Sequence, residues 1–427
     1  MRNTISSFTI AMKNKTGSGR MMVFLTVSGL ISNVLTIVSG LLVARWLLPE
    51  DLGLFNSFSI ITSYIILAQL GIPSGLSRQY PYYLGKDDKA GASQLAATAN
   101  YWSLALSLVI FLLSLVGTFY YLAIRNWEYA VGVFVIGIST FDGCYTTKYL
   151  KVLYRTNNDF NKISIINIIV AVVSFVTIFF VSSFGFYGLC IRAVIIIGTS
   201  FFFTWIWRPL AAKPAWTKSL FNELFKVGMP MYFVANIYSL WPIVQRTVVV
   251  SLGGNRALGL YGLGLMVGNS MSILTSSISG VAFPKMSMAW GRSHNFKQLI
   301  QVMYKPVLGG FVFNSLLVVG GWVILPYFVK FFLPNYVEGI KAAQWSLLVG
   351  LIAIFSVYAN VYMVIQRNTD RLKSYVTGFV IWAIVLFAFC HFRGFDLVIF
   401  PQAMLFGYVG IYTVDFFFYT RYKKMYS

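Results

Sequence analysis

Three charged side chains lie inside apolar stretches that are long enough to cross a membrane: Asp142, Arg192 and Arg246. A charge at the centre of a bilayer costs about 3 kcal/mol or more, so such residues are read by default as functional and each needs a partner. Arginine stays protonated, and its planar fork binds two phosphate oxygens at once. The two arginines are therefore suited to bind an anionic ligand.

Two interpretations of these charges remain open. In the functional one, Arg192 and Arg246 line a water-filled lumen and attract the anion. In the structural one, Arg192 pairs with Asp142, while Arg246 extends its head group to the outer interface.

Two carboxylates also have two interpretations each. Asp142 either takes up and releases a proton during a transport cycle or serves as a fixed counter-ion of Arg192. Asp415 lies near the inner end of the last apolar stretch, where an ion pair with Arg421 or Lys423 is favoured over a coupling role.

The composition identifies the kind of molecule that must position these residues. Hydrophobic residues make up 58% of the 427 residues and charged residues only 11%, with a formal net charge of +21. Soluble chains carry roughly 25% charged residues. This composition excludes most cytosolic enzymes and argues against a nucleic-acid binder, and we expect a polytopic membrane protein that contains only α-helices.

Cysteine, histidine and the N-terminus add further constraints. The three cysteines and two histidines show no ligand spacing, so neither a metal site, a cofactor nor a disulfide framework is expected. The apolar run after the basic segment Met1–Arg20 is too long for a cleavable signal peptide. It is expected to be the first membrane helix.

Twelve stretches approach the roughly 20 apolar residues that a membrane helix needs. They are residues 21–44, 54–76, 97–122, 129–150, 163–183, 185–207, 228–252, 259–283, 307–329, 342–365, 375–392 and 397–419.

The basic residues sort onto one side of these spans. Alternate loops and both termini together carry 25 of the 33 Lys and Arg residues, the opposite loops carry six, and Arg192 and Arg246 fall within spans. Cytoplasmic loops carry this excess in membrane proteins. Both termini are therefore expected to be cytoplasmic.

The loops suggest three regions: an N-terminal lobe at residues 1–207, a linker at 208–227 and a C-terminal lobe at 228–427. In the linker, apolar side chains recur at helical spacing, which predicts an amphipathic helix on the inner leaflet or a simple tether. The stripe consists of Trp216, Leu220, Phe221, Leu224 and Phe225.

The two lobes carry related segments. Leu52-Gly53-Leu54-Phe55 and Leu258-Gly259-Leu260-Tyr261 are 206 residues apart, and further short matches follow at nearly the same offset. Six spans per half with the same orientation predict a parallel repeat, an arrangement typical of transporters.

The polar residues within two spans form stripes. Ser28, Ser32, Thr36 and Ser39 share one helix face, and so do Asn269, Ser272, Ser276 and Ser279. Small residues on a stripe favour close helix packing. Contact with a ligand in a wet lumen is the alternative.

An ordered set of motifs resembles polysaccharide exporters of the multidrug/oligosaccharidyl-lipid/polysaccharide superfamily, above all the Wzx-type O-antigen flippases. The set comprises the segment from Ala44 to Asn56, Gly71-Ile72-Pro73, Leu153-Tyr154-Arg155, Gly228-Met229-Pro230 and Phe283-Pro284-Lys285. It covers the whole chain.

The resemblance implies two six-helix lobes with a MATE-like pseudo-two-fold and a cavity between them. It implies alternating-access transport of an undecaprenyl-diphosphate-linked glycan to the outer leaflet of the bacterial inner membrane. Membrane lipids, and a polymerase and a chain-length regulator of the same pathway, are the implied partners.

The resemblance also bears on individual residues. Arg78 and Lys285, at the inner ends of repeat-related spans, could meet the diphosphate first, although ordinary anchoring by positive charge explains them as well. Many relatives carry a carboxylate near the Gln245-Arg246 position, whereas this chain has Gln245. That departure argues against cation coupling there.

Rival functions differ in testable features. A multidrug/cation antiporter of the same fold favours acidic lumen residues, and lipid II flippases typically have fourteen spans. A polymerase or ligase of the same pathway needs a large external loop, which this chain lacks. With no catalytic motif in the sequence, we expect a transporter and not an enzyme.

Overall fold

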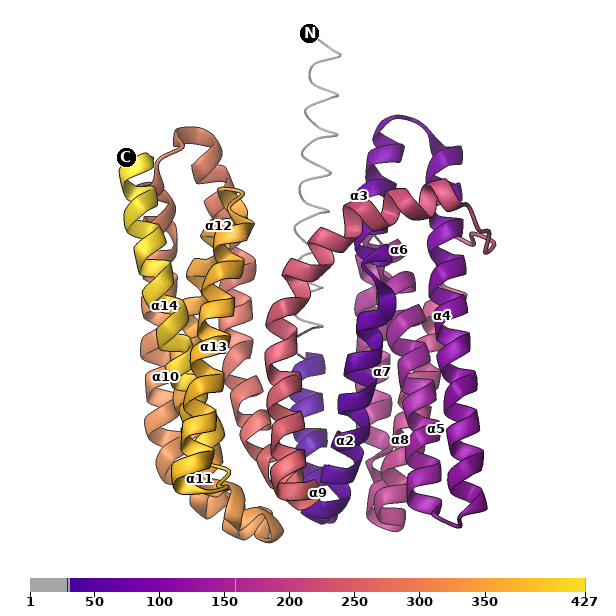
Figure 1. Ribbon diagram of the computed structural model, residues 1–427, viewed down its shortest axis with the longest axis vertical. Helices are drawn as coiled ribbons and strands as arrows, with labels where there is room; N and C mark the ends of the chain where they lie inside the picture. Colours follow the sequence, from indigo (N-terminus) through magenta and orange to yellow (C-terminus); the bar gives the residue numbers. More distant parts are fainter. Residues whose placement is uncertain (1–28, 30, 158, 427) are drawn as a thin grey trace. The chain divides into compact units, whose positions relative to one another are not determined.

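The computed structural model describes residues 29, 31–157 and 159–426, and these residues form helices and short connections without any β-strand (Figure 1). The first half contains the helix Ile31–Trp46, α2 (Pro49–Ile66), the 3₁₀ turn η1 (Leu67–Gln69), α3 (Ile72–Gly85), α4 (Lys89–Ala123), α5 (Trp127–Phe141), the π-helix η2 (Asp142–Leu150), α6 (Lys151–Thr156), α7 (Phe160–Val176) and α8 (Ile178–Ile206). The second half contains α9 (Lys218–Ser293), α10 (Phe296–Phe332), η3 (Pro334–Gly339), α11 (Ile340–Ala353), η4 (Ile354–Ala359), α12 (Asn360–Val364), α13 (Asn368–Arg393) and α14 (Ile399–Met425).

The helices assemble into two compact units. Unit 1 comprises Phe58–Phe233 and the described part of Met1–Leu47, and unit 2 comprises Leu48–Ser57 and Val234–Ser427. The expected boundaries at 207/208 and 227/228 therefore differ from this division, since the linker joins unit 1 and the start of α2 joins unit 2.

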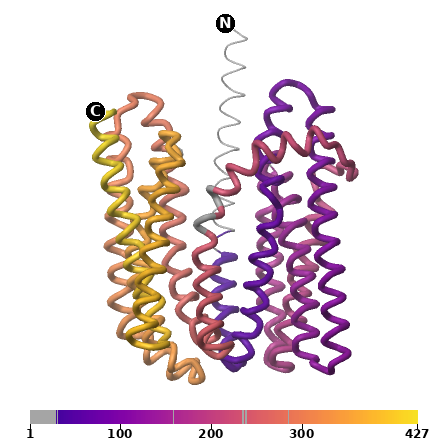
Figure 2. Tube along the Cα trace, in the orientation of Figure 1, coloured from indigo at the N-terminus to yellow at the C-terminus, as the bar shows by residue number. Residues whose placement is uncertain are grey.

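Within the described residues, nine helices are long and apolar enough to cross a membrane, and two shorter apolar helices, Ile31–Trp46 and Phe160–Val176, accompany them. One of the nine, Ser239–Ser293, contains a break at Gly254, where φ is 71° and ψ is −172°. Glycine adopts this conformation without a steric penalty. Figure 2 shows the trace of α9 turning back on itself along its length. The count of twelve spans and the cytoplasmic termini stay predictions, and the first expected span begins outside the described residues.

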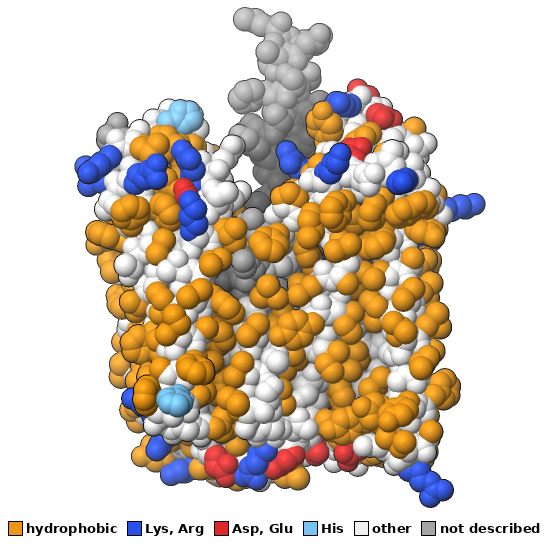
Figure 3. All heavy atoms as spheres, viewed as in Figure 1, with side chains coloured by type: hydrophobic (Ala, Val, Ile, Leu, Met, Phe, Trp, Pro, Cys, Tyr) orange, Lys and Arg blue, Asp and Glu red, His pale blue; other side chains and the backbone are white. Residues whose placement is uncertain are grey.

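On the face seen in Figure 3, charged side chains gather at the two ends of the helices. The side chains between these ends on the same face are mainly apolar or uncharged (Figure 3). Large apolar side chains remain exposed along this band, for example Leu113, Val116 and Phe119 of α4. Such a surface suits lipid contact.

The linker packs on unit 1 instead of forming a separate helix. Residues 208–217 run without helix, and α9 begins at Lys218. Leu224 is fully buried in a core that includes Ile72 and Leu95, with Phe221 and Phe225 packed against it. The apolar stripe expected to lie on the leaflet is therefore used largely for contact with α3 and α4.

The two repeat segments meet within unit 2. The position that a Cβ would occupy at Gly53 is filled by the carbonyl group of Asn255, and at Gly259 by that of Pro49. Gly53 and Gly259 are 206 residues apart, as are Pro49 and Asn255. The contact is therefore reciprocal, as at an interface with two-fold symmetry.

An ion pair continues this contact. Glu50 and Arg256, which share the separation of 206 residues, are joined by a 3.1 Å contact between Oε1 and Nη1. Arg256 also contacts Glu338 of η3 at 2.7 Å. Glu50 and Arg256 are thus equivalent positions of the two repeats, and they pair with each other at the contact.

Candidate functional site

The guanidinium of Arg192 is half-buried in unit 1 among three helices. Its Nη2 donates to Ser39 Oγ at 2.5 Å and to Ser174 Oγ at 2.6 Å, and its Nε donates to the Ser174 carbonyl oxygen at 3.2 Å. Ser39 and Ser174 are themselves buried. All three recorded acceptors are neutral oxygens, so the positive charge of Arg192 is positioned but not neutralised.

Asp142 does not neutralise this charge. No ion pair involves Arg192 in the part of the chain that the structure describes. Asp142 Oδ2 instead accepts a 3.4 Å hydrogen bond from Thr147, and the charge that acts on Asp142 comes from Lys151. The expected Arg192–Asp142 pair is therefore wrong, because Asp142 faces the turns that follow it in its own helix.

Asp142 begins the π-helix η2, which spans nine residues. Long π-helices are rare, and single π-bulges often mark functional sites. Gln69 Nε2 donates to the Cys144 carbonyl oxygen at 2.7 Å and so holds η2 against η1. Asp142 Oδ1 is buried and has no hydrogen-bond partner in the described residues. Asp142 thus keeps an acceptor available.

Arg246 lies in unit 2 on α9 and donates from Nε to the Pro242 carbonyl oxygen at 3.3 Å. Its neighbour Gln245 is buried and donates from Nε2 to the hydroxyl of Tyr261 at 2.5 Å. The Gln245 amide and the Tyr261 hydroxyl are both neutral and are hydrogen-bonded to each other. The Gln245 position therefore has no carboxylate that could bind a cation.

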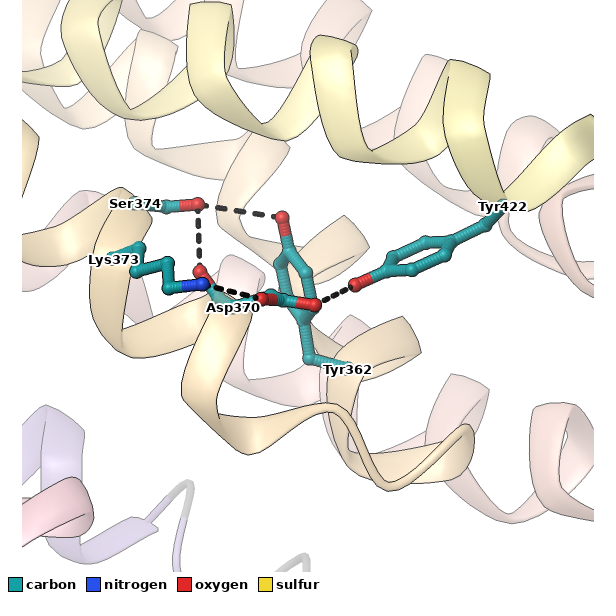
Figure 4. A network of polar contacts seen from close by, with 5 residues as sticks. All are labelled: Tyr362, Asp370, Lys373, Ser374 and Tyr422. Carbon is teal, nitrogen blue, oxygen red and sulfur yellow. Dashed lines mark hydrogen bonds and ion pairs between the residues drawn. The ribbon is translucent and has the colours of Figure 1, made fainter.

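Asp415 belongs to a network in unit 2 that Figure 4 shows in part. The buried carboxylate accepts a 2.5 Å hydrogen bond from Tyr362, whose hydroxyl lies 3.3 Å from Ser374 Oγ. The Ser374 hydroxyl donates to the backbone carbonyl of Asp370. The network thus ties α12, α13 and α14 together.

The expected pairing of Asp415 with Arg421 or Lys423 is not formed. On an α-helix, eight residues rise about 12 Å, so Lys423 lies beyond reach along the axis of α14. Lys423 is exposed, whereas Asp415 is 5% exposed. Near the C-terminal end of α14, the acidic residue is Asp370 instead. Its carboxylate accepts a 2.6 Å hydrogen bond from the Tyr422 hydroxyl and lies 3.3 Å from Lys373 Nζ.

Arg78 of α3 and Lys285 of α9 are both exposed. They belong to different units, and their role as first contacts for a diphosphate stays a prediction. Arg78 lies in the same unit as Arg192, and none of the three hydrogen bonds of Arg192 involves it.

Most of the polar stripe of α9 is exposed among the described residues of unit 2. Asn269, Ser272 and Ser276 are exposed, and the nearby Gly268 has no neighbouring atom where its Cβ would lie. Within unit 2 this exposure favours the ligand-contact interpretation, which stays a prediction. An exposed polar face on a membrane helix is suited to a water-filled cavity.

The sequence alone did not identify Ser174, Tyr261 or Tyr362 as partners of the candidate residues. Ser174 is one of many serines within the apolar stretches, and only the fold shows that it lies next to Arg192. Tyr261 carries a usable signal, because it lies in the repeated Leu-Gly-Leu segment. Tyr362 has no such signal.

A sequence profile of the family described as polysaccharide biosynthesis protein matches residues 18–290. No curated protein sequence matches significantly.

Solved structures of membrane transporters share the fold. An inward-facing multidrug resistance MATE family transporter of the MOP superfamily gives a TM-score of 0.75 at 16% identity, covering 95% of this chain and 100% of that chain. A MOP superfamily transporter from Pyrococcus furiosus, described as having a binding pocket of reverse polarity, gives 0.64 at 16% identity, covering 94% and 95%. The outward-facing form of a multidrug resistance MATE family transporter gives 0.62 at 16% identity, covering 95% and 96%. The expected all-α, MATE-like membrane fold is confirmed.

Proposed function

The chain belongs to the polysaccharide biosynthesis protein family and has the fold of MOP-superfamily transporters, and we propose that it is a flippase for an undecaprenyl-diphosphate-linked oligosaccharide. An O-antigen repeat unit is an example of such a substrate. The protein carries this lipid from the cytoplasmic to the outer leaflet of a bacterial inner membrane by alternating access.

The observation that carries this proposal is the chemistry around Arg192. Its guanidinium is half-buried and held by three hydrogen bonds to neutral oxygens, with no ion pair in the described residues. A buried cation without an opposite charge is costly, and a diphosphate would offset that cost through charge-assisted hydrogen bonds. This chemistry selects an anion and disfavours a cationic drug.

The exposed polar stripe of α9 supports the same proposal. Asn269, Ser272 and Ser276 offer side-chain oxygens and an amide to a hydroxyl-rich ligand. A glycan head group needs many such weak, adaptable contacts while its polyprenyl tail stays in lipid. We place Arg192 as the residue that meets the diphosphate and this stripe as a surface along which the glycan moves.

Asp142 is the better coupling candidate of the two carboxylates. Its Oδ1 has no hydrogen-bond partner among the described residues, whereas Asp415 is engaged by Tyr362. We therefore assign proton uptake to Asp142 and a structural role to Asp415. Arg246, Arg78 and Lys285 remain secondary candidates for contact with the diphosphate.

The first test is genetic complementation in cells whose surface glycan depends on this protein. Arg192→Ala removes the positive charge and is expected to abolish surface glycan at unchanged protein level, while Arg192→Lys keeps the charge and part of the activity. The matched control, Lys341→Ala, removes an exposed cation at the start of α11 and leaves glycan unchanged.

Two outcomes would count against this assignment. Full surface glycan in the Arg192→Ala cells would show that the guanidinium does not handle the substrate. Resistance to cationic drugs that depends on the protein, without any effect on glycan, would instead favour the multidrug antiporter.

A further inference from the structure

A second polar site lies in unit 1, apart from the Arg192 cluster. A cavity of about 190 Å³ opens where α4, the π-helix η2, the end of α8 and the segment Arg208–Pro214 meet. None of its lining residues accepts a hydrogen bond from Arg192 in the described part of the chain. Its chemistry is set by six residues: Asn100, Tyr145, Tyr149, Trp205, Arg208 and Lys213.

The cavity exists because the linker is pinned on one side. Asn100 Nδ2 donates to the Ala212 carbonyl oxygen at 2.7 Å, and the Ala215 amide donates to the Ala97 carbonyl oxygen at 3.2 Å. These two bonds hold the extended segment along α4. The aromatic wall opposite consists of Tyr145 and Tyr149, whose stacked rings are 5.5 Å apart.

Asn100 leaves one group unsatisfied at this cavity. The side chain is 5% exposed, and its Oδ1 has no hydrogen-bond partner among the described residues. Since Nδ2 is committed to Ala212, the orientation of the amide is fixed. A buried acceptor without a donor costs about 1–3 kcal/mol, so the site calls for a ligand group that donates a hydrogen bond.

Two cations line the same cavity. Arg208 lies 3.8 Å above the ring of Trp205 and donates to the Trp205 carbonyl oxygen at 3.1 Å, which fixes the plane of its guanidinium. Neither Arg208 nor Lys213 takes part in an ion pair in the part of the chain that is described, and no carboxylate lines the cavity. The site therefore presents two positive charges and one acceptor.

We propose that this cavity binds a phosphate ester whose organic part carries a hydroxyl group. The phosphate oxygens bind Arg208 and Lys213, and the hydroxyl donates to Asn100 Oδ1. A phospholipid with a glycerol head group and a soluble glycerol phosphate share this chemistry. The site is separate from the transport residues, and its occupant bridges η2 to the segment that leads into α9.

The full-length protein in lipid nanodiscs provides the test, with native mass spectrometry reporting which lipid is retained. Phosphatidylglycerol is expected to be retained about tenfold better than phosphatidylmethanol, which has the same charge but no hydroxyl, because only the former satisfies Asn100. The double variant Arg208→Gln/Lys213→Gln should lose at least tenfold in retention of phosphatidylglycerol. The matched control, Lys218→Gln/Lys226→Gln, removes two exposed cations nearby that do not line the cavity.

Competition with soluble sn-glycerol 3-phosphate separates the two sources. Displacement of the lipid at equal concentration identifies a soluble ester as an occupant, and failure to displace it identifies the lipid head group. Equal retention of phosphatidylglycerol by the Arg208/Lys213 double variant and the wild type would overturn the proposal. Equal retention of the two lipids by the wild type would also overturn it, because Asn100 would then play no part.

Discussion

Arg192 and Asp142 have opposite charges and lie in the same unit, but they have different hydrogen-bond partners. Arg192 is oriented by Ser39 and Ser174, whereas Asp142 sits on a π-helix with one carboxylate oxygen unpaired. A direct ion pair would neutralise both groups. In the proposed transport cycle, their separation leaves one cation for the diphosphate and one carboxylate for a proton.

If Asp142 takes up the proton, removing its carboxylate is expected to uncouple transport from the pH gradient. In proteoliposomes, a pH gradient is expected to stimulate transport by the wild type several-fold, because protonation of the carboxylate changes its charge during the cycle. Asp142→Asn, which cannot titrate, should transport at the same rate with and without the gradient. Unchanged stimulation in this variant would rule out Asp142, and Asp415→Asn serves as the matched control.

The buried hydrogen bond between Tyr362 and Asp415 predicts that removing either partner destabilises the folded protein. Tyr362→Phe leaves the buried carboxylate without its hydrogen-bond donor and is expected to lower the free energy of unfolding by about 1–3 kcal/mol. Asp415→Asn keeps a side chain that can accept from Tyr362 and should cost less. Thermal unfolding of the purified variants measures both, and a larger loss for Asp415→Asn than for Tyr362→Phe would contradict this assignment.

At the scale of the elements, the start of α9 acts as part of unit 1. Glu223 accepts hydrogen bonds from Gln79 Nε2 at 2.8 Å and from the Tyr83 hydroxyl at 2.9 Å. The bond to Glu223 raises the pKa of Tyr83, so the phenol stays protonated and remains a donor. The linker is thus attached to α3 by polar bonds as well as by its apolar stripe.

The reciprocal contact of α2 and α9 predicts that two glycines are irreplaceable. Gly53→Ala and Gly259→Ala each place a methyl group against a backbone carbonyl, and overpacking of this kind costs about 1–3 kcal/mol or more. We expect a sharp fall in the yield of folded protein for each variant, measured by size-exclusion fluorescence.

A control glycine exists on the same helix. Gly268→Ala meets no atom within 4 Å and should leave the yield unchanged, with the added benefit of alanine's higher helix propensity. Normal yields for Gly53→Ala and Gly259→Ala would show that the two segments do not pack as closely as described.

At the scale of the whole molecule, the sequence predicted the membrane class, the all-helical fold and the repeat, because hydropathy and residue spacing can be read from the chain directly. The repeat offset of 206 residues also maps Glu50 onto Arg256, which form the ion pair at the contact. These features depend on spacing along the chain, which a single sequence contains.

The side-chain partners could not be predicted in the same way. Arg192 bonds to Ser174 and Asp415 bonds to Tyr362, which requires knowing how each helix is rotated about its axis. Hydropathy carries little of that information when all faces of a helix are apolar. The π-helix η2 and the packing of Phe221 and Leu224 on unit 1 were missed for a similar reason, since tertiary contacts decide them.

We propose that this protein moves an undecaprenyl-diphosphate-linked oligosaccharide across a bilayer. The most direct measurement reconstitutes the wild type, Arg192→Ala and Lys341→Ala in liposomes containing a fluorescent lipid of this kind, and follows its accessibility to a membrane-impermeant quencher. We predict rapid translocation by the wild type and Lys341→Ala, and translocation near that of protein-free liposomes for Arg192→Ala. Accessibility that does not differ between wild-type and protein-free liposomes would contradict the account.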